Sequence, residues 1–192
     1  VNHGGTEMGQ GLYTKMQGIA MRELGLPAHA VRVMKTRTDK VPNTSATAAS
    51  SGADLNGAAV AAACTTLRQR MVPWAARKLG IPEDAVAFFE GRVGDGENSL
   101  SFAELAAHCW FNQVSLSSTG YYATPGLTYD RDAGRGRPFH YFTWGAAVSE
   151  VEVDGHTGMK RVLRADILQD VGDSLNPSID RGQIEGAFVQ GV

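Results

Sequence analysis

The residues whose types and spacing could do chemistry come early in the chain, in the sequence HGGTEMGQG at positions 3–11. Four of these nine residues are glycine, and a helical pattern follows them directly. Glycine lets another group approach the main chain closely, and a helix start offers unpaired N–H donors at the positive end of its dipole. The sequence therefore predicts either a loop that binds a polar or anionic ligand or a tight connection and nothing more.

The spacing of these glycines argues against the common nucleotide-binding loops. The segment lacks the G-x-x-x-x-G-K-[ST] pattern, and Gly5, Gly9 and Gly11 do not fit G-x-G-x-x-G. A ligand at this loop would be of a less common kind.

A second stretch rich in small and hydroxyl-bearing residues, VPNTSATAASSG, covers positions 41–52 and leads into an alanine-rich segment. Ser50 or Ser51 would stand at the start of the helix that follows. A hydroxyl there serves the helix N–H groups or an anionic ligand equally well. A simple cap and a ligand site both remain open.

A third segment near the end of the chain combines a helix start with exposed backbone. Asn176-Pro177 is typical of a first helical turn. Gly182 and Gly186 would share one face of that helix, and each costs about 1 kcal/mol relative to alanine. We expect a neighbouring group to press on this face, beside the amide of Gln183, which can donate and accept hydrogen bonds.

Helices must position these segments. Apolar residues recur with helical period over Leu12–Leu24, and Gly25 is a usual stop. The alanine-rich residues 53–79 predict a central helix whose neighbours pack close to its backbone, kinked or divided at Pro73. A capping-box pattern opens a further helix over Ser101–Trp110.

The strand pattern is weaker. Extended segments are predicted at residues 1–2, 31–34, 86–89, 140–153 and 160–171. The last two form a hairpin in which Glu150, Glu152 and Asp166 face solvent and are not paired for catalysis. Residues 125–138 are predicted to be a long flexible loop. Its arginine pair suggests phosphate binding, but a solvated surface loop is the favoured interpretation.

The composition excludes several classes of protein. With 43% hydrophobic residues in 192 and a net charge of −2, the chain is globular. Its 18 basic and 20 acidic residues form no face suited to nucleic acid, and no apolar span suggests a membrane segment. Cys64 and Cys109 are too few to staple the fold, so we expect buried thiols in a reducing, cytoplasmic setting.

The three segments share small residues that leave the main chain accessible, helix starts, and neutral amide or hydroxyl side chains. This combination suits a large polar cofactor. The segments resemble the molybdenum-binding part of the molybdenum hydroxylases, in their xanthine dehydrogenase branch. The resemblance extends over essentially the whole chain and rests on residues 3–11, 41–50, 140–145, 170–180 and 182–191.

The resemblance implies a molybdopterin cofactor carrying molybdenum, which hydroxylates hypoxanthine and xanthine to urate with oxygen from water. Electrons would pass to 2Fe-2S clusters and FAD in other parts of the complete enzyme, and then to NAD. The expected setting is purine catabolism by a cytoplasmic oligomer.

The resemblance also implies roles for particular residues. Met8, Gly9 and Gln10 match a loop that lies against the pterin and metal. Ala48 and Ala49 match small residues packed at the molybdenum, and Ala49 is the residue assigned to the metal. Ser50, Ser51 and Gly52 match a helix entry near the pterin and its phosphate, and Gln183 matches an amide that bonds the pterin.

No catalytic residue is expected within the chain. By the resemblance, the glutamate base lies beyond Val192 and the substrate-orienting residues lie before Val1, so the chain is interpreted as an internal fragment that is inactive alone. Glu7, Glu185 and Asp170 are not assigned as the base.

The expected fold is α+β, with helices layered on small mixed β-sheets. Residues 1–192 would be part of a molybdopterin-binding domain, subdivided near 115–140. Two alternatives are a non-catalytic docking module that binds no cofactor alone and a related aldehyde-oxidising molybdenum hydroxylase.

Overall fold

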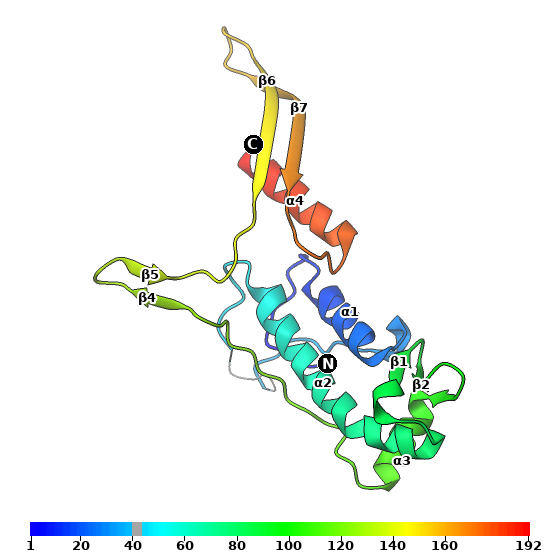
Figure 1. Cartoon of the computed structure of the whole chain (residues 1–192). Helices are drawn as coiled ribbons and strands as arrows, with labels where there is room; N and C mark the ends of the chain where they lie inside the picture. The colour runs from blue at the N-terminus through cyan, green and yellow to red at the C-terminus, as the bar shows by residue number, and fades with distance from the viewer. Residues whose placement is uncertain (40–43) are drawn as a thin grey trace. The chain divides into compact units, whose positions relative to one another are not determined.

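The computed structural model describes residues 1–39 and 44–192 of the chain. They form two compact units, Val1–Ala123 and Thr124–Val192. Each unit combines helices with small sheets, which confirms the α+β class (Figure 1). All pairings between the described strands are antiparallel, so the sheets are not mixed. Short turns join the paired strands, whereas parallel pairing would need longer crossover connections.

Helix α1 spans Leu12–Leu24, as its periodicity predicts. It buries Leu12, Met16, Ile19 and Ala20, the i, i+4, i+7 and i+8 positions of one helical face. The helix ends at Gly25, whose φ of 61° is left-handed and whose backbone N–H donates to Met21 O. The buried face of α1 packs against Val60 and Cys64, which lie in the first half of α2.

Helix α2 runs without a break over Gly52–Leu79, so the predicted division at Pro73 is wrong. Proline removes one helical hydrogen bond and crowds the preceding turn at a cost of about 3 kcal/mol. Burial of Met71, Ala75 and Ala76 on either side of the proline offsets that cost. The expected close packing is confirmed, because a Cβ added to Gly57 would lie 2.8 Å from Ile19 Cδ1.

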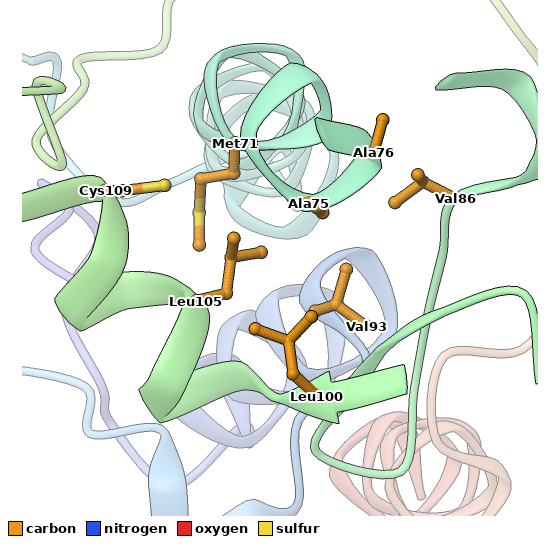
Figure 2. Close-up of a cluster of buried hydrophobic side chains, with 8 residues drawn as sticks. All are labelled: Met71, Ala75, Ala76, Val86, Val93, Leu100, Leu105 and Cys109. Atoms are coloured by element: carbon orange, nitrogen blue, oxygen red, sulfur yellow. The ribbon is translucent and has the colours of Figure 1, made fainter. Parts of the chain in front are cut away.

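The second half of α2 packs on a small sheet and a helix. Strands β1 (Ala87–Phe89), β2 (Arg92–Gly94) and β3 (Ser99–Ser101) form the sheet, and α3 covers Phe102–Phe111. The predicted strand at residues 86–89 is thus confirmed within one residue. Figure 2 shows Met71, Leu105 and Val93 turned toward one another at the centre of this core.

The predicted capping box at the start of α3 is confirmed. Ser101 Oγ accepts from Glu104 N at 3.2 Å, and Glu104 Oε2 accepts from Ser101 N at 2.8 Å. Both cysteines are buried and free in the described chain, and burial raises the pKa of the Cys64 and Cys109 thiols.

Strands predicted at residues 1–2 and 31–34 are wrong, because the described residues 1–39 contain no strand. The segments do meet: Val1 N donates to Arg32 O at 2.8 Å, and Met34 N donates to Val1 O at 2.9 Å. These two bonds join a single residue to the partner segment, which is too little to make a ladder. The short 3-10 helix η1 (Ala28–Ala30) directly precedes the second of these segments, and a second 3-10 helix, η2 (Glu83–Ala85), precedes β1.

The second unit contains a hairpin that sequence reasoning missed. Strands β4 (Thr128–Asp130) and β5 (Arg135–Arg137) pair within the stretch predicted to be a flexible loop. Asp130 Oδ1 accepts from the backbone N–H of Asp132 and Ala133, and Gly134 adopts a left-handed φ of 61°. An aspartate that bonds the backbone two residues on, followed by glycine, is a turn signal.

The predicted long hairpin is confirmed as β6 (Gly145–Val153) and β7 (Lys160–Gln169). The charges on it are exposed ion pairs: Arg161 lies 3.0 Å from Glu152, and Arg164 lies 2.7 Å from Asp166. These carboxylates therefore face solvent, as expected.

Helix α4 covers Pro177–Gly191, and Asn176 Oδ1 caps it by accepting from Ile179 N at 3.2 Å. A Cβ added to Gly182 or Gly186 would meet nothing within 4 Å, so the neighbour expected to press on this face is not found among the described residues. None of the described helices is long and apolar enough to cross a membrane.

Candidate cofactor-binding site

The glycine loop at residues 3–11 is held by the carboxylate of Glu7. Oε1 accepts from Gly9 N at 2.8 Å and from Gly11 N at 3.0 Å, and Oε2 accepts from Tyr13 N at 2.9 Å. Desolvation by burial opposes the charged form. The backbone N–H groups outweigh that effect, so the pKa of Glu7 lies below its ordinary value. Glu7 is therefore anionic at neutral pH and wrapped by the loop that follows it.

The side chain of Gln10 closes the same loop from the other side. Its Oε1 accepts from Met8 N at 2.6 Å, and its Nε2 donates to Thr6 O at 2.8 Å. One Nε2 hydrogen and one lone pair on Oε1 remain for a ligand. Because Glu7 and Gln10 engage the N–H groups of Met8, Gly9 and Gly11, these backbone groups are not the donors of an anion site.

The outer surface of the loop is open. Met8 is 68% exposed. Gly9 has a left-handed φ of 102°, and a Cβ added to it would meet nothing within 4 Å. A flat or bulky group could therefore approach the main chain at Gly9, beside the Met8 side chain.

The second candidate segment lies directly against this loop. Thr6 N donates to Thr47 Oγ1 at 2.8 Å. A Cβ added to Gly4 would come within 2.9 Å of Thr44 Cβ, so the side chain of Thr44 lies against the main chain at Gly4. The part of this segment at residues 41–43 lies outside the described residues. The structure thus brings the first two sequence-predicted segments together.

The turn into α2 is strained. Ala49 and Ser50 both have a φ of 57°, a left-handed conformation that costs roughly 1–2 kcal/mol for a residue other than glycine. Both residues are exposed, as is Ala48. Such strain concentrates at ligand sites and turns where the surrounding structure holds the backbone in place.

The serines do not act as the predicted cap. Ser51 occupies the N-cap position, but its side chain makes no capping hydrogen bond within the described chain. Its Oγ donates instead to Ala48 O at 3.2 Å. Without a side-chain cap, the first turn of this 28-residue helix offers its N–H groups to an anionic ligand, although Asp54 adds one negative charge to that turn.

Sequence reasoning missed the buried side chain of His3, which is 5% exposed. His3 Nδ1 accepts from Gly5 N at 3.1 Å, and Nε2 has no hydrogen-bond partner among the described residues. Burial lowers the pKa of His3, assisted by the charge of the Val1 amino group and opposed by Glu7. Its ring packs edge-on to Tyr13 at 5.2 Å. The His3 ring is thus neutral at pH 7 and buried against Tyr13.

We predict that the first unit loses stability as pH falls below 6.5, the ordinary pKa of histidine. Because the folded-state pKa is lowered, the unfolded chain binds the proton first, and stability decreases between 6.5 and that lowered value. Thermal unfolding at pH 7.5 and pH 5.5 measures the effect. The loss should shrink in His3→Gln and persist in the control His29→Gln, which changes an exposed histidine. Equal pH dependence in wild type and His3→Gln would contradict this assignment.

The third candidate, Gln183, lies on α4 in the second unit, and its side chain is exposed. The first unit carries Met8–Gln10 and Ala48–Gly52, on two segments that touch through Thr6 and Thr47, and we call these residues the first-unit surface. Gln183 belongs to the second unit.

The first-unit surface fits a large polar cofactor. It offers open main chain at Gly9, exposed small residues at Ala48 and Ala49, a helix start without a side-chain cap, and the remaining amide hydrogen of Gln10. No group of three histidine, cysteine, aspartate or glutamate side chains in the described residues could hold a metal ion. A metal here would have to arrive with ligands of its own.

Comparison with known proteins agrees with this interpretation. Residues 1–192 match the family described as "Molybdopterin cofactor-binding domain". The chain is 48% identical over its whole length to "Xanthine dehydrogenase" of Dictyostelium discoideum and to "Xanthine dehydrogenase/oxidase" of Rattus norvegicus. It spans 13% of the length of each of these curated relatives.

Solved structures share the fold. Quinoline 2-oxidoreductase from Pseudomonas putida 86 matches 96% of this chain with 23% of its own, at a TM-score of 0.79 and 25% identity. Aldehyde oxidoreductase from Desulfovibrio gigas matches 95% of this chain with 18% of its own, at a TM-score of 0.69 and 26% identity.

Fold and family match together define the chain as a cofactor-binding α+β domain. The chain belongs to the molybdopterin cofactor-binding domain family.

Proposed function

We propose that the chain is the part of a molybdenum hydroxylase that holds molybdopterin, in an enzyme of the xanthine dehydrogenase kind. The observation that carries this proposal is the contact between the glycine loop and the segment before α2, made through Thr6 N and Thr47 Oγ1. That contact joins the two predicted cofactor segments of the first unit, in a chain that matches the family over residues 1–192.

Each segment offers groups that match a different part of the cofactor. The edge of a pterin is a row of donors and acceptors, which suits the remaining hydrogen of Gln10. The amide of Gln183 has the same chemistry, and its part in binding the pterin is proposed from the resemblance alone. Ala48 and Ala49 leave room for the metal, and Met8 and Gly9 offer a surface for the pterin.

The start of α2 completes the proposed site. Ser50, Ser51 and Gly52 stand at its first turn, where the N–H groups and the helix dipole favour the cofactor phosphate. When bound, the cofactor would supply the hydroxylation of a ring carbon with oxygen from water. This chain's residues bind and orient the cofactor, and Glu7 stays with the loop and takes no part as a base.

The complete protein would hydroxylate hypoxanthine and xanthine. It would pass electrons to 2Fe-2S clusters, FAD and NAD through parts outside this chain, as a cytoplasmic oligomer. The similarity to relatives named xanthine dehydrogenase, at 44–48% identity, supports this choice over an aldehyde-oxidising enzyme, whose matching structure is 26% identical.

The test is the molybdenum and pterin content of the complete protein, with wild type compared with Gln10→Ala and Gln183→Ala. We expect both variants to lose cofactor. Gln17→Ala is a matched control, because Gln17 also uses its amide within the first unit, donating to Ala28 O at 2.9 Å and Val31 O at 2.8 Å.

Three results would contradict the proposal or a part of it. The absence of molybdenum from the wild-type complete protein would favour the docking module. Full cofactor content in both Gln10→Ala and Gln183→Ala would remove these residues from the site. Turnover of an aldehyde in place of hypoxanthine or xanthine would favour the aldehyde-oxidising alternative.

A further inference from the structure

Glu7 stands out because a single carboxylate organises most of the loop that carries the proposed site. Its two oxygens accept from three backbone N–H groups, those of Gly9, Gly11 and Tyr13, at 2.8, 3.0 and 2.9 Å. These bonds span the residues on either side of Gln10 and reach into the first turn of α1. The side chain thus fixes both the loop and its junction with the helix.

Residues 8–11 need side-chain hydrogen bonds to hold one conformation. Gly9 and Gly11 both have left-handed φ values, 102° and 79°, and glycine loses more conformational freedom on ordering than other residues do. The bonds to Glu7, together with those of Gln10 and the bond from Lys15 N to Gly11 O, hold residues 8–11 in one shape. Gln10 in turn bonds within the loop, from Met8 N and to Thr6 O, so its position depends on that shape.

The charge of Glu7 suits this role. Hydrogen bonds to an ionised carboxylate are shorter and stronger than neutral ones, and this carboxylate also lies at the N-terminus of α1. Burial raises the pKa of Glu7, but the backbone N–H groups of Tyr13, Gly11, Gly9 and Leu12 together outweigh burial, so the pKa lies below its ordinary value. The clamp is therefore in place throughout the neutral pH range.

We infer that Glu7 is a positioning residue, which holds Met8, Gly9 and Gln10 in the shape that meets the cofactor without touching the cofactor itself. This inference rests on the proposed function. It assigns a role to a carboxylate that is neither a base nor a ligand. Its oxygens are already engaged by the backbone, which leaves the side chain committed to the loop.

The inference is tested in the complete protein with Glu7→Gln. Glutamine has nearly the same shape, but it loses the charge and turns an NH₂ group toward one of the backbone donors. We expect backbone amide exchange in a peptide covering residues 8–13 to become about tenfold faster or more, measured by mass spectrometry. Molybdenum content per folded protein should fall by a similar factor.

The matched control is Glu104→Gln. Glu104 accepts from the backbone N–H of Ser101 at the start of α3, so it makes the same kind of bond away from the loop. This change should speed exchange only near residues 101–105 and leave molybdenum content at the wild-type level. Glu7→Asp keeps the charge on a shorter side chain. It should give an intermediate result and serves as the second variant if Glu7→Gln does not fold.

The outcomes separate the clamp from the proposed function. Unchanged exchange over residues 8–13 in Glu7→Gln would overturn the clamp. Faster exchange with wild-type molybdenum content and an unchanged paramagnetic resonance spectrum of the reduced metal would show a purely structural role and overturn the positioning role. Absence of molybdenum from the wild type would overturn the proposed function and the positioning role with it, whereas the exchange response would still report the clamp.

Discussion

Replacing Ala49 by Leu is expected to lower the molybdenum content of the complete protein by about tenfold or more. Ala49 is exposed, so the larger side chain displaces nothing within the described chain. It would project into the space that the proposed cofactor occupies. Crowding a well-packed site costs about 1–3 kcal/mol, and 1.4 kcal/mol is a factor of ten in binding. Metal analysis of the purified protein, together with its thermal unfolding, measures both effects.

Ala49→Gly is the control for this substitution. Ala49 has a φ of 57°, which glycine adopts freely. The change should therefore relieve backbone strain and preserve both the turn and cofactor binding. We expect wild-type molybdenum content in Ala49→Gly and a folded protein with little molybdenum in Ala49→Leu. Wild-type content in both would mean that the space beside Ala49 is not where the cofactor binds.

The largest expected effect on stability comes from Gly120→Ala. A Cβ at Gly120 would lie 2.7 Å from Ala63 N and closer still to Ala59 O, both in the backbone of α2. A helix backbone cannot yield as a flexible side chain does, so residues 114–122 would have to separate from α2. We expect a loss of about 3 kcal/mol or more in the free energy of unfolding, measured by urea titration of the first unit.

Gly18→Ala is the matched control, because it makes the same chemical change within α1. A Cβ there meets nothing within 4 Å, so alanine should stabilise the helix by about 1 kcal/mol. We expect Gly120→Ala to lower the free energy of unfolding and Gly18→Ala to raise it. A loss of stability in Gly18→Ala as large as that in Gly120→Ala would mean that the close approach to α2 is not the cause.

The long helices could be predicted because their signals are local. For α1 the apolar period and the glycine stop lie within 14 residues, and for α3 the capping box lies within four. The β6–β7 hairpin was likewise visible in alternating residues and the turn at Asp154, whose Oδ1 accepts from His156 N at 2.8 Å. Such elements carry their own start and stop signals.

Other features depend on geometry that residue types do not reveal. Two left-handed residues at Ala49 and Ser50 could not be foreseen, because alanine and serine rarely adopt a positive φ. The hairpin of β4 and β5 has strands of three residues, too short to show alternation. Glu7 and Gln10 accept hydrogen bonds from the backbone of their own loop, and such local bonds leave no periodic pattern in the sequence. An acidic residue among glycines was the one hint of them.

The proposed site was therefore predicted in outline and changed in detail. The resemblance named Met8–Gln10 and Ala48–Gly52, and the structure joins these two segments through Thr47. Gln10 was expected to lie against the pterin, and the structure adds that its amide also accepts from Met8 N and donates to Thr6 O within the loop. The expected role of Gln183 stays a prediction.

The most direct test of the central claim is an experimental structure of the complete protein with its cofactor bound. The account predicts molybdopterin density against both Met8–Gln10 and Ala48–Gly52, with the phosphate near the first turn of α2 and the metal beside Ala49. Density for the cofactor that contacts neither of these segments would contradict the account.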